Sequence, residues 1–171
     1  MKIAIIGYSG SGKSTLAVFL GERYRSEVLH LDRIQWLPGW KERDADSKKH
    51  MVKEFLDTHD GWVIDGNYTS LFYERRMEEA DLIIELLFGR IPCYFRVWKR
   101  YLTYKGRSRP DMTEGCSEKL DLELTKWVFI NGRTTEKRNR YRAVQEKYPE
   151  KTLVFRNIRQ LKRFLGREKT R

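Results

Sequence analysis

The sequence of 171 residues is poor in the residue types that build disulfide frameworks and metal centres. It has two cysteines, Cys93 and Cys116, which stand far apart in the chain, and three histidines with no metal-ligand spacing. Such a pattern favours two reduced thiols in a cytosolic protein over a disulfide or a zinc site. A dedicated transition-metal site is therefore not expected.

Long apolar runs are also absent. The run Leu82–Phe88 is short and is interrupted by Glu85, whereas a membrane span needs roughly 20 apolar residues. The apolar start of the chain passes at once into glycine-rich sequence without a cleavage site. We therefore expect a cytoplasmic protein with no membrane partner.

What the sequence has in excess is positive charge. Lysine and arginine number 35 against 24 acidic residues, which gives a formal net charge of +11. An excess of this size indicates an anionic partner such as a nucleotide or a nucleic acid. The alternative is a basic surface that is only well solvated, and composition does not choose between them.

Strand and helix patterns alternate five times along the chain. Alternation of this kind predicts an α/β fold with a five-stranded parallel sheet and helices on both faces. We see no repeat or linker and expect one domain over 1–171. The expected strands are 2–7, 27–32, 61–65, 81–88 and 152–155; the expected helices are 13–24, 44–59, 71–79, 92–104, 121–148 with a break at 131–132, and 158–165. We expect a loop at 33–43 and a mobile excursion at 105–120.

Residues 7–15, GYSGSGKST, match the phosphate-loop pattern GxxxxGK[ST] at every fixed position. An apolar strand precedes the motif and a helical pattern follows it, as the motif requires. Backbone N–H groups of such a loop converge on phosphates, the lysine adds a cation, and the serine hydroxyl supplies a ligand to Mg²⁺. The predicted cofactors are therefore ATP and Mg²⁺. The expected nucleotide-binding residues are Gly7, Ser9, Gly10, Ser11, Gly12, Lys13, Ser14 and Thr15.

Longer segments resemble the adenylate-kinase-like group of small P-loop kinases, and within it the family of the DNA topology modulation protein FlaR. The segments that carry the resemblance are GYSGSGKSTLA, HLDRIQWLPGW, WVIDGNY, ADLIIELLFGRIPCYFRVWKR and GRSRPDMTEGCSEKLDLE. The resemblance implies a P-loop NTPase fold with an acceptor-binding insertion at 33–60 and a lid at about 96–142. It also implies an ATP-dependent phosphotransferase.

The same resemblance assigns roles to individual residues. Asp65, which ends the third strand, looks like the carboxylate that organises magnesium together with Ser14. Arg96 and Arg100 resemble the paired arginines at the lid hinge, and with Lys13 they are the expected catalytic cations. Asp32 lies where related small-molecule kinases place a carboxylate near the acceptor hydroxyl, so it is an expected catalytic and substrate residue.

Other residues of the expected acceptor region are less certain in role. Asn67 follows Asp65-Gly66 where adenylate kinases continue with Pro-Arg, so a nucleoside monophosphate acceptor is not implied. Trp36 and Trp40 flank a Pro-Gly turn and either contact the acceptor or pack the insertion against the core. The acidic residues around the excursion either pair with lid arginines or form surface charges; they are Asp111, Glu114, Glu118 and Asp121.

Two functions are compatible with these patterns. The first is a kinase that transfers phosphate from ATP to a nucleotide or small-molecule acceptor. The second is a nucleotide-dependent DNA-binding or regulatory protein, for which the net charge of +11 would contact phosphate backbones. The sequence has no zinc finger, basic zipper or RNA-recognition motif, and we favour the kinase.

Overall fold

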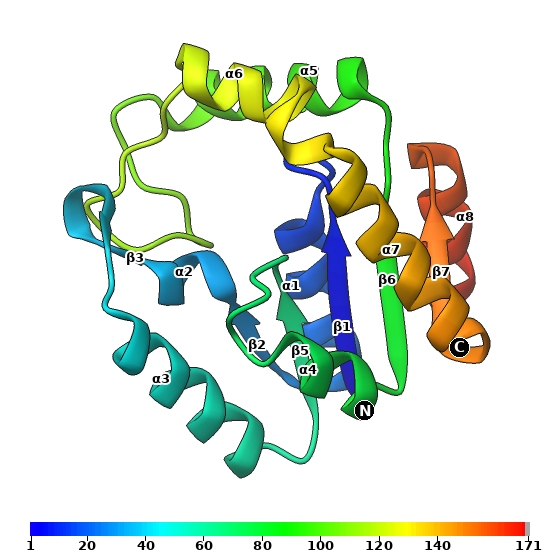
Figure 1. Cartoon of the computed structure of the whole chain (residues 1–171). Coiled ribbons are helices and arrows are strands. Elements are labelled where there is room, and N and C mark those ends of the chain that lie inside the picture. The colour runs from blue at the N-terminus through cyan, green and yellow to red at the C-terminus, as the bar shows by residue number, and fades with distance from the viewer. Residues whose placement is uncertain (170–171) are drawn as a thin grey trace.

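A computed structural model describes residues 1–169 of the chain, and its centre is a five-stranded sheet in the order β2-β5-β1-β6-β7 (Figure 1). Every neighbouring pair in this sheet is parallel. The expected α/β fold is confirmed. The strands are β1 (Lys2–Gly7), β2 (Glu27–His30), β5 (Trp62–Asp65), β6 (Leu82–Leu86) and β7 (Thr152–Phe155).

The central strands are apolar because both of their faces are covered. Successive side chains of a strand point to opposite faces, so Ala4 and Ile6 belong to one buried cluster and Ile3 and Ile5 to the other. All four are completely buried. This explains why β1 shows a continuous apolar run and not an alternating pattern.

Helices cover both faces, with α7 in front of the sheet and α1 behind it in the view of Figure 1. Side chains of α2, α3, α4 and α7 belong to the first buried cluster, and side chains of α1, α5, α6 and α8 to the second. The helices are α1 (Lys13–Tyr24), α2 (Leu31–Gln35), α3 (Ala45–Thr58), α4 (Tyr73–Glu79), α5 (Arg90–Tyr104), α6 (Leu122–Phe129), α7 (Thr135–Lys147) and α8 (Ile158–Lys169). None of the helices in the described part is long and apolar enough to cross a membrane.

The segment after β2 differs from the expectation. We expected a strand to Asp32 and a loop from 33 to 43, but the strand ends at His30 and helix α2 begins at Leu31. Leu31 and Ile34 are three residues apart and both bury, which is a helical spacing. The rest of the segment contains β3 (Trp36–Leu37), the short helix η1 (Pro38–Trp40) and β4 (Lys41–Glu42).

The excursion at 105–120 lies beyond the carboxyl ends of the strands and approaches the β3–β4 hairpin (Figure 1). Isolated bridges join Lys105 to Glu118 and Ser108 to Ser117, so its two arms run together. The expected helix break at 131–132 is confirmed, because η2 (Asn131–Arg133) separates α6 from α7. The remaining short helix is η3 (Pro149–Lys151).

Candidate functional site

The phosphate-loop motif forms the turn between β1 and α1, and its glycines are there for steric reasons. Gly7 has φ 139° and Gly10 has φ 74°, conformations that other residues rarely adopt. A Cβ atom on Gly7 would lie 2.4 Å from the carbonyl oxygen of Leu86, and one on Gly10 would lie 2.5 Å from that of Cys93. The loop is therefore seated directly on β6 and α5.

Asn67, just after β5, holds the start of this loop. Its Oδ1 accepts from the N–H of Gly7 at 3.0 Å, and its Nδ2 donates to the carbonyl oxygen of Gly7 at 2.7 Å. The side-chain amide that the sequence suggested as a substrate contact is thus bonded to the phosphate loop. A matched pair of bonds to one backbone unit fixes the loop relative to β5.

Ser14, Asp65 and His30 form a polar chain at the first turn of α1. The Ser14 hydroxyl donates to Oδ2 of Asp65 at 2.9 Å, and Nδ1 of His30 lies 2.5 Å from the other carboxylate oxygen. Burial opposes a charge on His30, but the hydrogen bond and negative charge of Asp65 outweigh it and raise the pKa of His30. A serine hydroxyl and a carboxylate side by side are oxygen ligands of the type that Mg²⁺ prefers.

Lys13 and Asp32 meet at the same end of the sheet. Lys13 Nζ donates to the carbonyl oxygen of Tyr8 at 3.1 Å. Burial lowers the pKa of Lys13, while the nearby carboxylates of Asp32 and Asp65 act in the opposite direction. Oδ1 of Asp32 accepts a hydrogen bond from the Tyr68 hydroxyl at 2.7 Å, while Oδ2 accepts none from the described residues.

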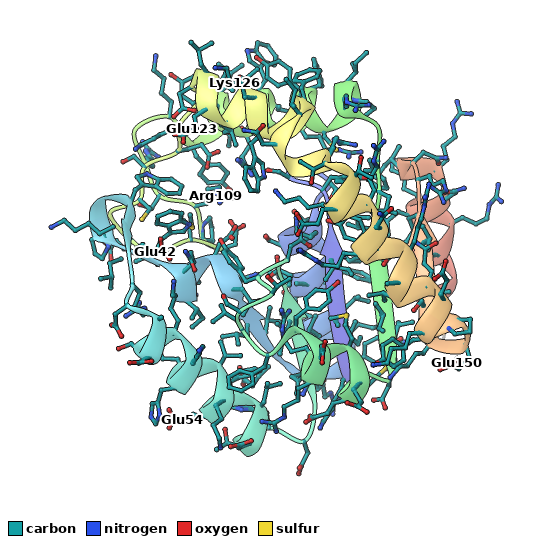
Figure 2. The ribbon with its side chains drawn as sticks, in the orientation of Figure 1. Glu42, Glu54, Arg109, Glu123, Lys126 and Glu150 are labelled. Carbon is teal, nitrogen blue, oxygen red and sulfur yellow. The ribbon has the colours of Figure 1, made fainter. Side chains whose placement is uncertain are left out.

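A network of alternating charges joins α5 to the excursion. Glu118 is 6% exposed, and it binds Arg100 at 2.6 Å and Arg109 at 2.8 Å. Arg109 also binds Asp111 at 3.1 Å. Figure 2 shows Arg109 on the inner side of the excursion, whereas Lys126 of α6 lies at the outer edge of the molecule.

This network reaches the phosphate loop. Asp111 lies beside Ser14, and although burial acts in the opposite direction, the charge of Arg109 and the proximity of the Ser14 hydroxyl lower the pKa of Asp111. Burial and the like charge of Arg109 lower the pKa of Arg100. Two of the four acidic residues around the excursion, Asp111 and Glu118, therefore pair with arginines. Asp121 instead accepts from the N–H of Leu124 and begins α6.

The second expected hinge arginine is placed differently. The guanidinium of Arg96 lies 4.8 Å from the centre of the Phe88 ring, and its buried Nη1 has no hydrogen-bond partner among the described residues. A buried guanidinium nitrogen without a partner is costly, and an incoming anion would satisfy it. Arg90, at the start of the same helix, donates to the carbonyl oxygen of Phe129 at 2.9 Å.

The two tryptophans pack against each other and against the excursion. Their ring centres are 5.7 Å apart in an edge-on arrangement. Trp40 Nε1 donates to the carbonyl oxygen of Ser117 at 3.0 Å, and the Thr113 hydroxyl donates to that of Trp36 at 2.7 Å. The N–H of Gly39 donates to the carbonyl oxygen of Gly115 at 3.1 Å. The hairpin and the excursion are thus bonded to each other.

Two buried arginines in the neighbourhood are not among the assigned site residues, although Arg133 belongs to a basic run that could supply further lid contacts. Arg76 is completely buried and donates to the carbonyl oxygens of Gly66, Tyr68 and Leu71. Arg133 stacks its guanidinium 3.8 Å from the centre of the Tyr8 ring in the phosphate loop. Neither arginine belongs to a sequence motif. Arg76 donates to backbone carbonyls, which carry no residue signature, and Arg133 contacts the ring of Tyr8, which is remote along the chain.

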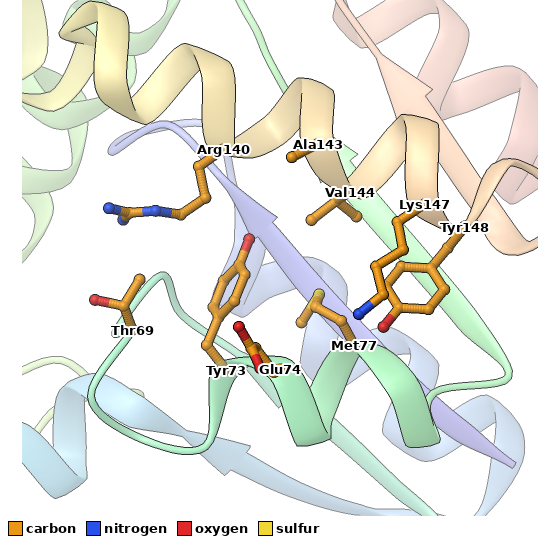
Figure 3. A pocket seen from close by; sticks show the side chains of 9 residues that line it. All are labelled: Thr69, Tyr73, Glu74, Met77, Arg140, Ala143, Val144, Lys147 and Tyr148. Atoms are coloured by element: carbon orange, nitrogen blue, oxygen red, sulfur yellow. The ribbon is translucent and has the colours of Figure 1, made fainter.

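A pocket of about 280 Å³ lies away from the phosphate loop, between α4 and α7. Figure 3 shows the Tyr73 side chain standing in it, with Arg140 and Lys147 on the α7 side. The Tyr73 hydroxyl has no hydrogen-bond partner in the part of the chain described. None of the residues that the sequence analysis assigned to the site lines this pocket.

Comparison with known proteins identifies the fold. No family model matches the chain, and no curated protein matches it. Among solved structures, a deoxyadenosine kinase from M. mycoides with bound dATP aligns over 100% of both chains at 15% identity with a TM-score of 0.55. A gluconokinase from Sinorhizobium meliloti aligns over 90% of this chain and 80% of its own, at 15% identity with a TM-score of 0.46, which is too low to support an argument.

The resemblance to the FlaR family stays a prediction, since neither of these two solved structures tests it. The sheet order, the phosphate loop between β1 and α1 and the full-length alignment agree with one another. The chain has the fold of the P-loop kinases.

Proposed function

We propose that the protein is a Mg²⁺-ATP-dependent phosphotransferase that acts on a hydroxyl-bearing nucleotide or small molecule. The observation that carries the proposal is a convergence of charge. Lys13 lies within electrostatic reach of Asp32, Asp65 and Arg100, which come from three other elements of the fold. Cations for phosphate, a ligand for magnesium and a free carboxylate oxygen thus meet in one place.

The phosphate loop would hold the nucleotide. In this proposal the backbone from Gly7 to Thr15 surrounds the phosphates and Lys13 neutralises their charge. Ser14 and Asp65 would hold Mg²⁺, which supplies charge neutralisation at the phosphates. Mg²⁺ keeps several waters and uses one or two protein oxygens, and this fits a chain whose described residues contain no cluster of three metal-binding side chains. The bound dATP of the deoxyadenosine kinase is compatible with such a site.

Asp32 would act on the acceptor. With Tyr68 bonded to one carboxylate oxygen, the other oxygen is available to orient the acceptor hydroxyl or to take its proton. Trp36 and Trp40 would close the acceptor region, which we place at 33–60. Arg96 and Arg100 would contact the transferred phosphoryl group from the lid at about 96–142, where charge develops during transfer.

The test is release of ADP from Mg²⁺-ATP with a panel of acceptors: nucleosides, nucleotides, small hydroxylated metabolites and duplex DNA. We expect one class of small acceptor to stimulate release strongly. Lys13→Ala should abolish turnover by removing nucleotide binding, whereas Lys53→Ala, which removes an exposed lysine of α3, should not change it. Stimulation by DNA alone would favour the nucleotide-dependent DNA-binding protein suggested by the FlaR resemblance.

Asp32→Asn separates binding from transfer. The variant should retain ATP affinity, because Asp32 lies outside the phosphate loop, and should lose about 100-fold or more in kcat for the true acceptor. Asp46→Asn, at the exposed start of α3, is the matched control. Unchanged turnover in Asp32→Asn would remove this residue from the mechanism.

A further inference from the structure

The pocket between α4 and α7 combines an apolar floor with cationic side chains at its ends. Met77 and Val144 form the floor; both are buried and belong to the first cluster (Figure 3). Arg140 and Lys147 stand on the α7 side, two helical turns and so about 10 Å apart along the axis. Small-molecule sites have this composition, a mostly apolar lining with a few polar groups.

Tyr73 places a polar atom inside this pocket. Its side chain rises from α4 with the hydroxyl turned toward α7 (Figure 3). Tyr73 is 9% exposed, and its hydroxyl has no hydrogen-bond partner among the residues that the structure describes. A buried polar atom without a partner is costly, and a phenylalanine would fill the same space without that cost. The hydroxyl therefore indicates a hydrogen-bond partner that comes from outside the chain.

The partner must be a hydrogen-bond acceptor. Burial and the charge of Glu85 raise the pKa of Tyr73 to about 12, so the hydroxyl keeps its proton and donates. Arg140 lies within electrostatic reach of Tyr73. One of its nitrogens, Nη2, donates to Glu136, whose side chain is largely exposed, and surface pairs of this kind are weak. Nε and Nη1 of Arg140 donate to no described residue. Two donors thus converge at one end of the pocket.

The charges of the lining indicate an anion. The cations of Arg140 and Lys147 stand against one carboxylate, that of Glu74. Arginine binds carboxylates and phosphates through paired, charge-assisted hydrogen bonds. We propose that the pocket between α4 and α7 binds a small organic anion, whose carboxylate or phosphate group contacts Tyr73 and Arg140 and whose apolar body lies on the floor.

The size and position of the pocket limit what it binds. Its volume of about 280 Å³ is near the lower end of the range for ligand pockets, about 300 Å³, which fits a single ring or a short chain. Tyr141 follows Arg140 and points about 100° away around the helix, where its ring meets that of Tyr8 at 5.5 Å. The pocket and the phosphate loop therefore contact different faces of α7. A ligand would bind here whether or not the protein transfers phosphate.

Titration of the isotope-labelled full chain with phenylacetate and with phenyl phosphate, followed by NMR, tests the proposal. We expect a Kd on the order of 1 mM, with shifted amides at 69–77 and 140–148. Phenyl phosphate has a second possible place at the phosphate loop; Lys13→Ala should remove the shifts there and leave those at α4 and α7. Binding of either anion at α4 and α7 supports the proposal, and the tighter one names the anionic group. Shifts confined to the phosphate loop, or none with about 20 mM of either probe, would overturn it.

Variants test the contacts. Tyr73→Phe should weaken phenylacetate binding about tenfold without lowering the denaturation midpoint, because the lost hydroxyl has no partner among the described residues. Arg140→Gln should weaken both probes about tenfold or more. Arg142→Gln removes an exposed cation of α7 that does not line the pocket and should change nothing. Unchanged affinity in folded Tyr73→Phe, or equal binding of the uncharged 2-phenylethanol, would contradict the proposed contacts.

Discussion

Glu85 lies in strand β6 with no exposed surface. Gln145 of α7 donates to its Oε2 at 2.5 Å, while its Oε1 has no hydrogen-bond partner among the described residues. Burial raises the pKa of Glu85 to about 7. The carboxyl group therefore carries a proton in the folded protein at pH values where it would be ionised in the unfolded chain.

This shift predicts a loss of stability as the pH rises. A carboxyl group whose pKa is higher in the folded than in the unfolded chain stabilises the fold at pH values below its unfolded-state pKa. This stabilisation disappears as the pH rises through the folded-state pKa of about 7. The full effect is roughly 3 kcal/mol. Glu85→Gln should remove this part of the pH dependence, which denaturant unfolding at pH 5 and pH 8 would measure. An equal pH dependence in the wild type and the variant would contradict the assignment.

Arg76 predicts a second effect of a single residue. Its guanidinium satisfies three backbone carbonyls in the turn after β5. Arg76→Met should destabilise the protein by about 3 kcal/mol, because these buried acceptors lose their donors. Arg75→Met changes the neighbouring arginine, whose partners Asp57 and Glu79 lie at the surface, and should cost about 1 kcal/mol or less. Chemical denaturation of both variants is the measurement.

At the scale of elements, the contact between the hairpin and the excursion has a measurable strength. Trp40→Phe keeps a ring but removes the bond to Ser117, which contributes about 1 kcal/mol. The Gly39 amide, which donates to Gly115, should then exchange its hydrogen about fivefold faster. Trp127→Phe changes a tryptophan of α6 that is 46% exposed and should leave exchange at Gly39 unchanged.

The elements and the contacts between them show what the sequence can and cannot predict. The strands were predictable because continuous apolar runs have a local cause, and the helix break at Asn131-Gly132 was predictable from its turn residues. Helix α2 was missed because five residues hold too little of a helical period. The bond from Trp40 to Ser117 joins residues 77 positions apart, and the two bonds from Asn67 to Gly7 span 60. Contacts of this kind depend on the folded topology, so no local pattern indicates them.

At the scale of the whole molecule, nucleotide binding should stabilise the fold. At a concentration of about 100 times Kd, a ligand adds about 2.7 kcal/mol to the free energy of unfolding. For a chain of this length, the Tm should rise by roughly 5 to 10 °C with Mg²⁺-ATP. A thermal unfolding scan measures this shift, which Lys13→Ala should abolish. An equal shift in that variant would place the nucleotide elsewhere.

The pairing of Arg100 and Arg109 with Glu118 and Asp111 has a consequence for selectivity under the proposed function. At Arg100 and Arg109 the protein supplies its own counter-anions, so an incoming phosphate must exchange with carboxylates at these two arginines. An anion of low charge, such as free phosphate, gains little from this exchange. A triphosphate, which also engages the loop around Lys13, has enough charge to complete it. Under the proposed function the resident carboxylates would thus set a charge threshold for entry, so that anions of low charge would be rejected without being excluded by size.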